Sequence, residues 1–431
     1  MSVHGEPLRR RLPLRRAWTV LLLDVVCGAA ALITGRDLYA HLAYLLTAAL
    51  LLSFWWGWSA TRGLRFRRYT RTSRAQVGRP LEERFTLINR SRWPKLGLVV
   101  YDHSELPGHR AGQVLPYLRP RGEHGWTVRT LCTRRGRFRL GPVTIAGGDP
   151  LGLFEFRRRL PESNLIVVYP ATVPVRGFPH PVGHLPGGDA LRRRTHHVTT
   201  NAAGVRDYVP GDGFNRIHWP STARQRRLIV KEFELDPRAE VWLFLDVERG
   251  VHVRLRLHEA ERLRQERRTW WERLEHLELE PSTEEYAVTA AASVARHFIR
   301  GRRAVGLVAY GQRREVIPAG RGERQLGKIL DTLAALRATG EVPFAQVLSA
   351  EGRRLPRGAL VVAISPSIRA EWVEAALSLG RAGRNVVAIL VDGAAFGGPV
   401  GAAALGERLR AAGVPALVLR RRADLVLDFP A

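Results

Sequence analysis

Two apolar runs near the start of the chain constrain its fold more than any other feature. They cover about residues 17–34 and 38–60, and each is close to the roughly 20 residues with which an α-helix crosses the hydrocarbon core of a bilayer. Only Gly35, Arg36 and Asp37 separate them, so the pair predicts a transmembrane helical hairpin. The second run argues against a cleaved signal peptide, which carries one short apolar segment.

Arginines flank both outer ends of this hairpin. They precede the first run and follow the second: Arg9, Arg10, Arg11, Arg15, Arg16, and then Arg62, Arg65, Arg67, Arg68, Arg71 and Arg74. Basic flanks stay in the cytoplasm. The pattern therefore predicts a two-pass protein of the cell inner (cytoplasmic) membrane, with the lipid bilayer as a partner and the soluble domains in the cytoplasm.

Polar and aromatic residues within the hairpin carry further expectations. Trp55, Trp56 and Trp58 lie where interfacial aromatic residues are expected. Asp24 stands inside the first run, where a carboxylate costs about 2.5–3.5 kcal/mol. We expect Asp24 to face the partner helix or a neighbouring subunit, or to be protonated.

The net charge of +28 raises the question of nucleic-acid binding. Arginine supplies almost all of the positive charge, since Lys95, Lys231 and Lys328 are the only lysines. The arginines are spread along the chain and no nucleic-acid-binding motif accompanies them, so we expect no nucleic-acid partner. The two cysteines, Cys27 and Cys132, allow neither a disulfide framework nor a Cys-x-x-Cys metal site, which fits a reducing compartment.

After an anchor over residues 1–74, residues 75–170 have the pattern of a β-rich, sandwich-like domain. Short strand patterns alternate there with Pro, Gly and Asn, at 82–89, 96–101, 125–132, 138–145 and 165–169. Residues 171–238 hold a Pro/Gly/His/Arg-rich linker and a compact polar segment. Residues 239–431 alternate strands with helices, which predicts a doubly wound α/β domain. The strands are expected at 241–245, 305–309, 359–364, 386–391 and 416–419, and the helices at 283–300, 323–337, 369–382 and 402–412.

The compact segment at 204–232 fits neither helical nor strand periodicity. Its most distinctive residues are Arg206, Asp207, Tyr208, Pro210, Gly211, Asp212, Arg216, His218, Trp219 and Arg224. This segment, hereafter the signature, closely resembles that of the bacterial "domain of unknown function 58" family, and residues 135–142 and 149–154 resemble segments that precede it there. The resemblance implies a membrane-anchored protein whose C-terminal half is similar to a von Willebrand factor A domain. It also implies a partner of a MoxR-type AAA+ ATPase in envelope or complex maturation.

Two interpretations of the signature remain open. Its charged residues could form an ion-pair lattice that fastens the sandwich to the α/β domain, because buried charges persist only when paired. Alternatively, the segment is an exposed recognition surface.

A metal-ion-dependent adhesion site would follow the first strand of a von Willebrand factor A domain as Asp-x-Ser-x-Ser. Here Asp246 matches, but Glu248 and Gly250 replace both serines, and Ser365 and Ser367 follow the expected fourth strand without an acidic residue. We therefore expect a degenerate site with no resident metal, in which Asp246 and Glu248 are weak candidates for Mg²⁺.

Other chemical motifs are weaker. Residues 322–328 have the spacing of a phosphate-binding loop, but Ile329 stands where Ser or Thr belongs and helical spacing runs through it, so we expect no nucleotide. Prolines among His180, His184, His196 and His197 favour a solvated loop over a zinc site. His218 and Ser221 lie close together in the sequence, but the Gly-x-Ser-x-Gly motif of a hydrolase is absent. We therefore expect His218 to be a hydrogen-bonded structural residue.

No catalytic residues or cofactor are expected from these motifs. The sequence favours a non-enzymatic membrane adaptor or assembly factor, with a hydrolase that uses signature residues, or a magnesium-dependent adhesion domain, as alternatives. The charged insertion at 253–279 is expected to form an amphipathic helix, either as a solvated extension or as an interface.

Overall fold

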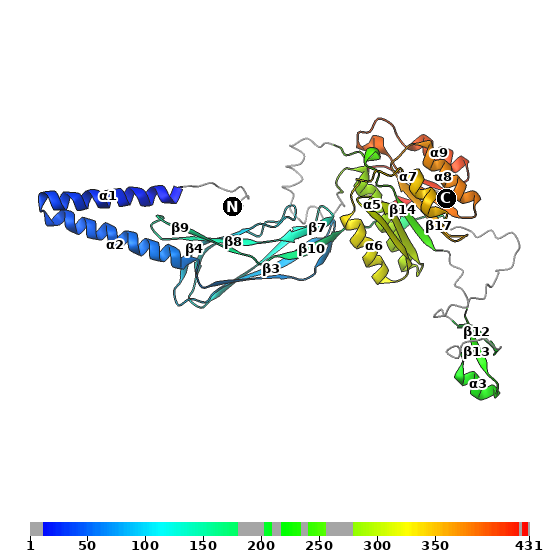
Figure 1. The fold of residues 1–431 in the computed structure, drawn as a ribbon, viewed down its shortest axis with the longest axis horizontal. Helices are drawn as coiled ribbons and strands as arrows, with labels where there is room; N and C mark the ends of the chain where they lie inside the picture. Colours follow the sequence, from blue (N-terminus) through cyan, green and yellow to red (C-terminus); the bar gives the residue numbers. More distant parts are fainter. Residues whose placement is uncertain are drawn as a thin grey trace.

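The computed structural model describes residues 12–179, 202–208, 217–233, 240–255, 279–421 and 425–429. The helical hairpin lies at one end of an elongated molecule, the β-sandwich follows it and the α/β domain lies beyond (Figure 1). The linker histidines, the signature residues Pro210, Gly211, Asp212 and Arg216, and most of the charged insertion lie outside the described residues.

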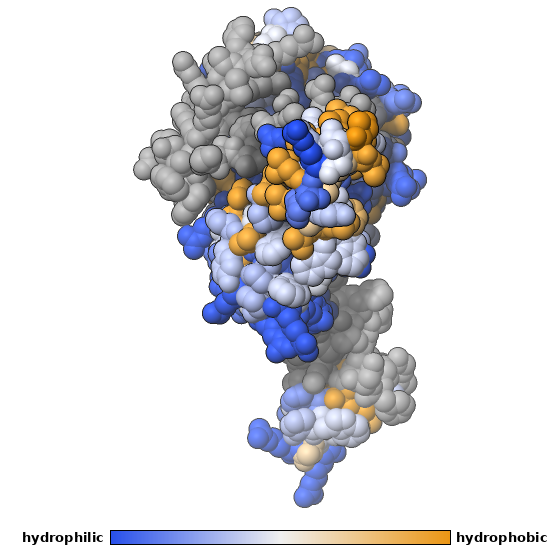
Figure 2. Space-filling model, turned by 90° about the vertical axis from the view of Figure 1, so that its left-hand side faces the viewer, coloured by the Kyte–Doolittle hydropathy of each residue, from blue (hydrophilic) through white to orange (hydrophobic). Residues whose placement is uncertain are grey.

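Helices α1 (Leu12–Thr34) and α2 (Asp37–Ala60) form the expected hairpin. Both are long and apolar enough to cross a membrane, and large apolar side chains such as Leu22 and Leu32 are exposed along them. Figure 2 shows these hydrophobic residues at the hairpin end of the molecule, with hydrophilic residues around them. The Thr47 hydroxyl of α2 donates to the Asp24 carboxylate at 2.9 Å, so Asp24 faces the partner helix.

The sandwich contains two facing sheets and a smaller third one. The first has the order β1 (Leu64–Thr70), β3 (Pro80–Asn89), β6 (Glu123–Leu131). The second has the order β5 (Gln113–Leu118), β4 (Lys95–Asp102), β8 (Val143–Gly148), β9 (Glu155–Leu160). Phe85, Leu98 and Ile145 are fully buried in the core between these sheets. The third sheet has the order β2 (Arg74–Gln76), β10 (Asn164–Tyr169), β7 (Gly136–Leu140).

The sandwich begins at Leu64, so the expected boundary at residue 75 was wrong. In β1, Leu64 and Phe66 are buried while Arg65 and Arg67 are exposed. The outward arginines concealed this strand alternation, because the same residues fit a basic membrane flank. The single strand expected at 138–145 was also wrong: a turn at Gly141 and Pro142 divides it into β7 and β8.

The α/β domain is built on one six-stranded sheet. Its order is β16 (Arg314–Gly320), β15 (Val305–Tyr310), β14 (Val241–Leu245), β17 (Leu360–Ser365), β18 (Asn385–Val391), β19 (Ala416–Leu419). All neighbours pair in parallel except the edge strand β16. Numbered within the domain, this is the 3-2-1-4-5-6 order of a doubly wound fold. The antiparallel edge strand was not expected from the sequence.

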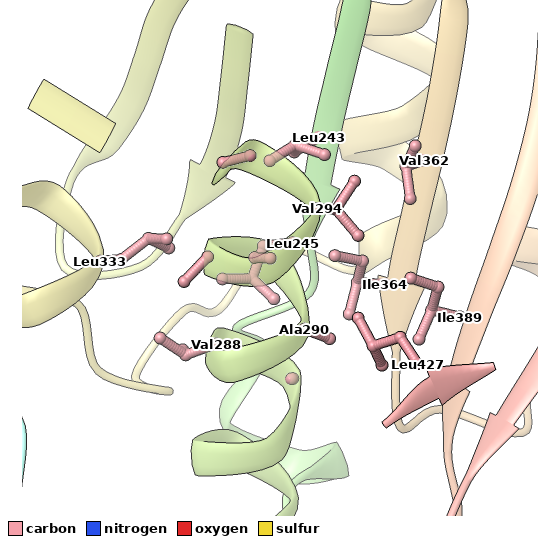
Figure 3. Packing of buried hydrophobic residues seen from close by; sticks show 14 of the residues in the cluster. Leu243, Leu245, Val288, Ala290, Val294, Leu333, Val362, Ile364, Ile389 and Leu427 are labelled. Atoms are coloured by element: carbon pink, nitrogen blue, oxygen red, sulfur yellow. The ribbon is translucent and has the colours of Figure 1, made fainter. Parts of the chain in front are cut away.

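Helices cover both faces of that sheet. On one face, α5 (Thr283–Arg300) and α6 (Glu323–Ala335) bury residues against Leu243 and Leu245. Figure 3 shows Ala290 and Val294 of α5 beside these strand residues. On the other face, α7 (Phe344–Gly352), α8 (Ala370–Arg381) and α9 (Ala403–Ala411) pack around Phe244. The expectation of alternating strands and helices is confirmed, and α6 runs through the residues with phosphate-loop spacing.

Two further strand pairs complete the described chain. Strand β11 (Val175–Arg176) pairs in parallel with β20 (Leu427–Asp428), so the segment after the sandwich joins the end of the chain. Strands β12 (Ala202–Asp207) and β13 (Ile229–Phe233) form an antiparallel pair that carries α3 (Trp219–Gln225) between them. Figures 1 and 2 show this unit apart from the rest of the described fold.

Candidate functional site

The carboxyl edge of the α/β sheet gathers the residues expected there. Asp246 follows β14 and is 1% exposed. One of its carboxylate oxygens accepts from the Ser365 hydroxyl at 2.6 Å, and the other accepts from the Glu248 backbone N–H at 2.9 Å. The Ser365 oxygen in turn accepts from the Ser367 N–H at 2.9 Å. Strands β14 and β17 therefore bring together residues that are far apart in the sequence.

Burial dominates the electrostatics of Asp246. Desolvation raises the pKa of its carboxyl to about 6, although the hydrogen bonds from Ser365 and Glu248 partly oppose this change. Behind it, the Nε2–H of His252 donates to the Asp246 carbonyl at 3.0 Å. Burial lowers the pKa of His252 and so favours its neutral imidazole. The other ring nitrogen, Nδ1, lies 3.2 Å from the Thr283 hydroxyl.

At this edge an arginine side chain compensates the negative charge of Glu248. The Arg369 guanidinium lies 2.7 Å from the Glu248 carboxylate, and the Arg369 side chain remains largely exposed. Both oxygens of Asp246 are already engaged by protein donors. Within the described ranges, no group of three or more His, Cys, Asp and Glu side chains is placed to hold a metal ion. Glu248 is therefore neutralised by a side chain of the same domain.

The signature residues that the structure describes lie on the separate β12–α3–β13 unit. Arg206 and Asp207 are in β12, Tyr208 follows it, and Trp219 and Arg224 are in α3. The Asp207 carboxylate pairs with Arg227 of the same unit at 2.9 Å, and both side chains are exposed. This ion pair lies within the unit, whereas Asp212, Arg216 and the side chain of Arg206, the other members of the expected ion-pair lattice, lie outside what the structure describes. Trp219 is 64% exposed, as a recognition surface requires.

His218 and Ser221 lie together at the start of α3. The Ser221 hydroxyl is 2.7 Å from His218 Nδ1, and the Ser221 N–H also donates to that nitrogen at 3.3 Å. His218 is the N-cap residue of α3, so this contact satisfies a backbone donor that the first helical turn leaves free. In a catalytic triad, the serine faces Nε2 and an acid holds Nδ1, whereas here Nδ1 itself faces the serine.

The junction between the two soluble domains is built around Arg135, a residue that the sequence reasoning did not single out. Its side chain is buried, and its guanidinium donates to the Glu284 carboxylate at 2.5 Å and contacts the Glu285 carboxylate. It also donates to the carbonyls of Leu333 at 3.1 Å and Leu336 at 3.0 Å. The guanidinium thus joins the start of α5 to the end of α6, where negative partial charge favours a cation.

Additional contacts reinforce this junction. Asp331 of α6 accepts from the Tyr169 hydroxyl of β10 at 3.0 Å and pairs with Arg74 of β2 at 3.2 Å. Burial, together with the hydrogen bond to Asp331, raises the pKa of Tyr169 to about 12. The Thr172 hydroxyl accepts from Arg296 of α5 at 2.5 Å. The sandwich and the α/β domain therefore share a polar interface made by several elements.

A model of a known protein family matches part of this chain. The model for "Protein of unknown function DUF58" matches residues 204–257 and 277–395. The matched part of the chain belongs to the DUF58 family. The matched residues hold the signature, the Asp246 edge and the sheet from β14 to β18, whereas the hairpin and the sandwich lie outside the match.

A curated relative of this DUF58 chain is the "Uncharacterized protein YeaD" of Bacillus subtilis (strain 168). The two are 23% identical over 215 residues, which cover 49% of this chain and 46% of the relative. The match therefore spans about half the length of that relative.

Two solved structures resemble parts of this DUF58 chain. The CARDB domain of the PF1109 protein from Pyrococcus furiosus is 15% identical, with 24% of this chain and 91% of that chain covered and a TM-score of 0.18. The C-terminal domain of wzt is 8% identical, with 26% and 75% covered and a TM-score of 0.20. These likenesses support no statement about activity.

The sandwich of this DUF58 chain also contains a buried polar cluster. Arg68 pairs with Asp102 at 2.6 Å, and His109 Nε2 lies 3.0 Å from Asp102 and 3.2 Å from Glu83. Burial disfavours the charged form of Asp102, but hydrogen bonds from His109 and Ser104 and the charge of Arg68 outweigh it and lower its pKa. The cluster lies within the sandwich core, where Arg68 compensates the charge of Asp102.

Proposed function

We propose that this DUF58 chain is a membrane-anchored, non-enzymatic adaptor or assembly factor. In this proposal the hairpin crosses the inner membrane with both termini in the cytoplasm. The α/β domain is a von Willebrand factor A-like docking module, and its partner is a MoxR-type AAA+ ATPase. The partner and the pathway come from the family resemblance.

The observation that carries the proposal is the continuous scaffold from α2 to the α/β domain. Phe54 of α2 packs edge to face against Phe154 and Phe156, with ring centroids 5.6 Å apart in both pairs. The buried Lys95 ammonium donates to the Ser59 carbonyl near the end of α2, and Arg135 connects the sandwich to α5 and α6. A scaffold of this kind holds a docking domain at a fixed distance from the membrane, as an adaptor requires.

The sheet supports a docking module of the von Willebrand type without a metal ion. Its strand order and its antiparallel edge strand fit that interpretation. Asp246 stands at the end of the first strand, but Arg369 compensates the charge of Glu248. In our proposal, docking by this domain therefore requires no Mg²⁺.

The signature unit is the proposed contact with the ATPase. Trp219 and Leu228 are exposed apolar residues, and Arg224, Arg226 and Arg227 are exposed beside them. Exposed aromatic and arginine side chains are the residue types that dominate binding energy in protein interfaces. The separation of this unit in Figure 1 favours access by a partner.

Co-purification tests this function. The tagged full-length chain would be co-expressed with a MoxR-type ATPase, solubilised in detergent and captured with ATP present. We expect recovery of the ATPase, and loss of most of it for the double variant Trp219→Ala with Leu228→Ser. Tyr69→Ala is the matched control, because Tyr69 on the sandwich is 65% exposed and Trp219 64%. No recovery with the wild type, or equal loss with the control, would contradict the proposal.

A hydrolase is the second candidate, because His218 Nδ1 and the Ser221 hydroxyl lie 2.7 Å apart, although a triad would use Nε2 there. A panel of ester and peptide substrates would be tested with the wild type and with Ser221→Ala. Turnover that Ser221→Ala abolishes would replace the adaptor proposal. Turnover that Ser221→Ala leaves unchanged would show that Ser221 is not the nucleophile.

A further inference from the structure

We propose that two neighbouring loops at the α2 end of the sandwich bind the headgroups of anionic phospholipids. We define these loops as the basic loop pair: residues 90–94 between β3 and β4, and residues 119–122 between β5 and β6. The inference rests on the hairpin lying in the bilayer, which is one part of the proposed function, and does not depend on the identity of any protein partner.

Aromatic contacts fix the first loop against α2. The Trp93 ring packs edge to face on Trp55, with centroids 5.5 Å apart. One turn further along α2, the Arg62 guanidinium lies 3.7 Å above the Trp58 ring. The first loop therefore lies at the level where α2 leaves the apolar part of the hairpin.

A buried asparagine holds the second loop beside the first. The Asn89 side-chain amide donates to the carbonyls of Trp93 at 2.9 Å and Arg119 at 3.1 Å. The Asn89 carbonyl oxygen accepts from the Ser91 hydroxyl at 2.7 Å. The Arg121 N–H donates to the Ser91 carbonyl at 3.1 Å. Because these bonds join the two loops directly, their side chains present one surface.

That surface carries uncompensated positive charge. Arg90, Arg92, Arg119 and Arg121 are all exposed, and none forms an ion pair within the described residues. Glu123, which follows the second loop, is exposed and acidic, but one carboxylate does not balance four arginines.

The neighbouring loop between β8 and β9 adds little opposing charge. Asp149 is buried and accepts from the N–H groups of Leu151 and Phe154. Glu155 pairs with Arg157 at 2.7 Å. The arginines of the basic loop pair thus face solvent in a surface with a net positive charge.

Exposed apolar side chains beside these arginines favour a lipid surface as the binding partner of the basic loop pair. Trp93 is 56% exposed beside these arginines, and Leu151 on the neighbouring loop is 62% exposed. Tryptophan and arginine together suit the headgroup layer, where the ring lies among the lipids and the guanidinium meets phosphate. The surface is also continuous with the apolar face of the hairpin, where α2 contacts β4, β8 and β9 (Figure 1).

Native mass spectrometry of the full-length chain in detergent tests this proposal. Delipidated protein would be titrated with dioleoyl phosphatidylglycerol and, separately, with dioleoyl phosphatidylcholine. We expect tighter binding of the anionic lipid, and a rise of about a hundredfold in its apparent Kd for the triple variant Arg90→Gln, Arg92→Gln, Arg119→Gln, since each arginine near an anionic surface is worth about fivefold. Binding of phosphatidylcholine should not change.

The matched control removes three exposed arginines elsewhere on the sandwich: Arg71→Gln, Arg137→Gln and Arg139→Gln. We expect the control to keep the wild-type preference for phosphatidylglycerol, and both variants to melt at the wild-type temperature by circular dichroism. An unchanged preference in the first variant, or equal loss in the control, would overturn the proposal. Failure to recover a protein partner would leave this result intact, so the two proposals fail separately.

Discussion

Arg135 of the sandwich donates to the carboxylate of Glu284 in α5 at 2.5 Å, although 149 positions separate the two residues. Arg337 provides a second cation, 3.6 Å from Glu284 and 3.8 Å from Glu285. Two arginines therefore balance two carboxylates where the domains meet. Because the Arg135 side chain is inaccessible to solvent, the balance depends on the domains staying together.

Substitution of Arg135 should destabilise the chain strongly. Arg135→Met leaves two carboxylates and the carbonyls of Leu333 and Leu336 without their donor, and breaking a buried ion pair costs about 3–5 kcal/mol. We expect a lower denaturant midpoint and faster proteolysis at the junction in the detergent-solubilised full-length chain. The exposed Arg137, two residues further along in β7, provides the control Arg137→Met. Equal midpoints for the two variants would show that Arg135 does not connect the domains.

The raised pKa of Asp246 should make stability depend on pH. At 1.36 kcal/mol per pKa unit, the rise from 3.8 to about 6 corresponds to about 3 kcal/mol of preference for the protonated form. A raised folded-state pKa contributes stability that is complete below the unfolded value and is lost as the pH rises through about 6. We therefore expect Asp246→Asn to raise the melting temperature relative to wild type at pH 7.5, to keep about half of that advantage at pH 5 and to lose it only below the unfolded value of 3.8. An advantage independent of pH would refute this linkage.

Magnesium should not stabilise the α/β domain. Protein donors engage both Asp246 oxygens, and Arg369 engages Glu248. We expect melts of the full-length chain to coincide with and without millimolar Mg²⁺, since a ligand of the native state raises its stability. Saturable stabilisation that disappears in Asp246→Ala would reveal a functional metal site.

The hairpin should place both soluble domains in the cytoplasm. Reporter fusions after Gly63 and at Ala431 should give cytoplasmic signals, and an insertion between Gly35 and Arg36 should give a periplasmic one. Arginines cluster at the outer ends of the hairpin, whereas the connector has Arg36 alone, next to Asp37. A periplasmic signal at Ala431 would invert the topology.

Local sequence patterns were sufficient to predict most of the helices and strands. Unbroken apolar runs such as Val241–Leu245 could only be buried strands or helices, and their length and punctuation separated the two. The polar edge strand β16 and the arginine-rich strand β1 were missed, because exposed faces carry little apolar signal. Glu248 and Arg369 also lay outside such reasoning as a pair, since 121 positions separate them.

The sequence by itself determined the hairpin, the alternation of strands and helices and the presence of Asp246 at a strand end. Periodicity reports which face of one element is apolar, and these features depend on nothing else. Only the tertiary structure decided that Arg135 is buried between two helices, that Arg369 compensates Glu248, and that Asn89 joins two basic loops. The partners of a polar side chain depend on which elements meet, and that is set by the packing of the whole chain.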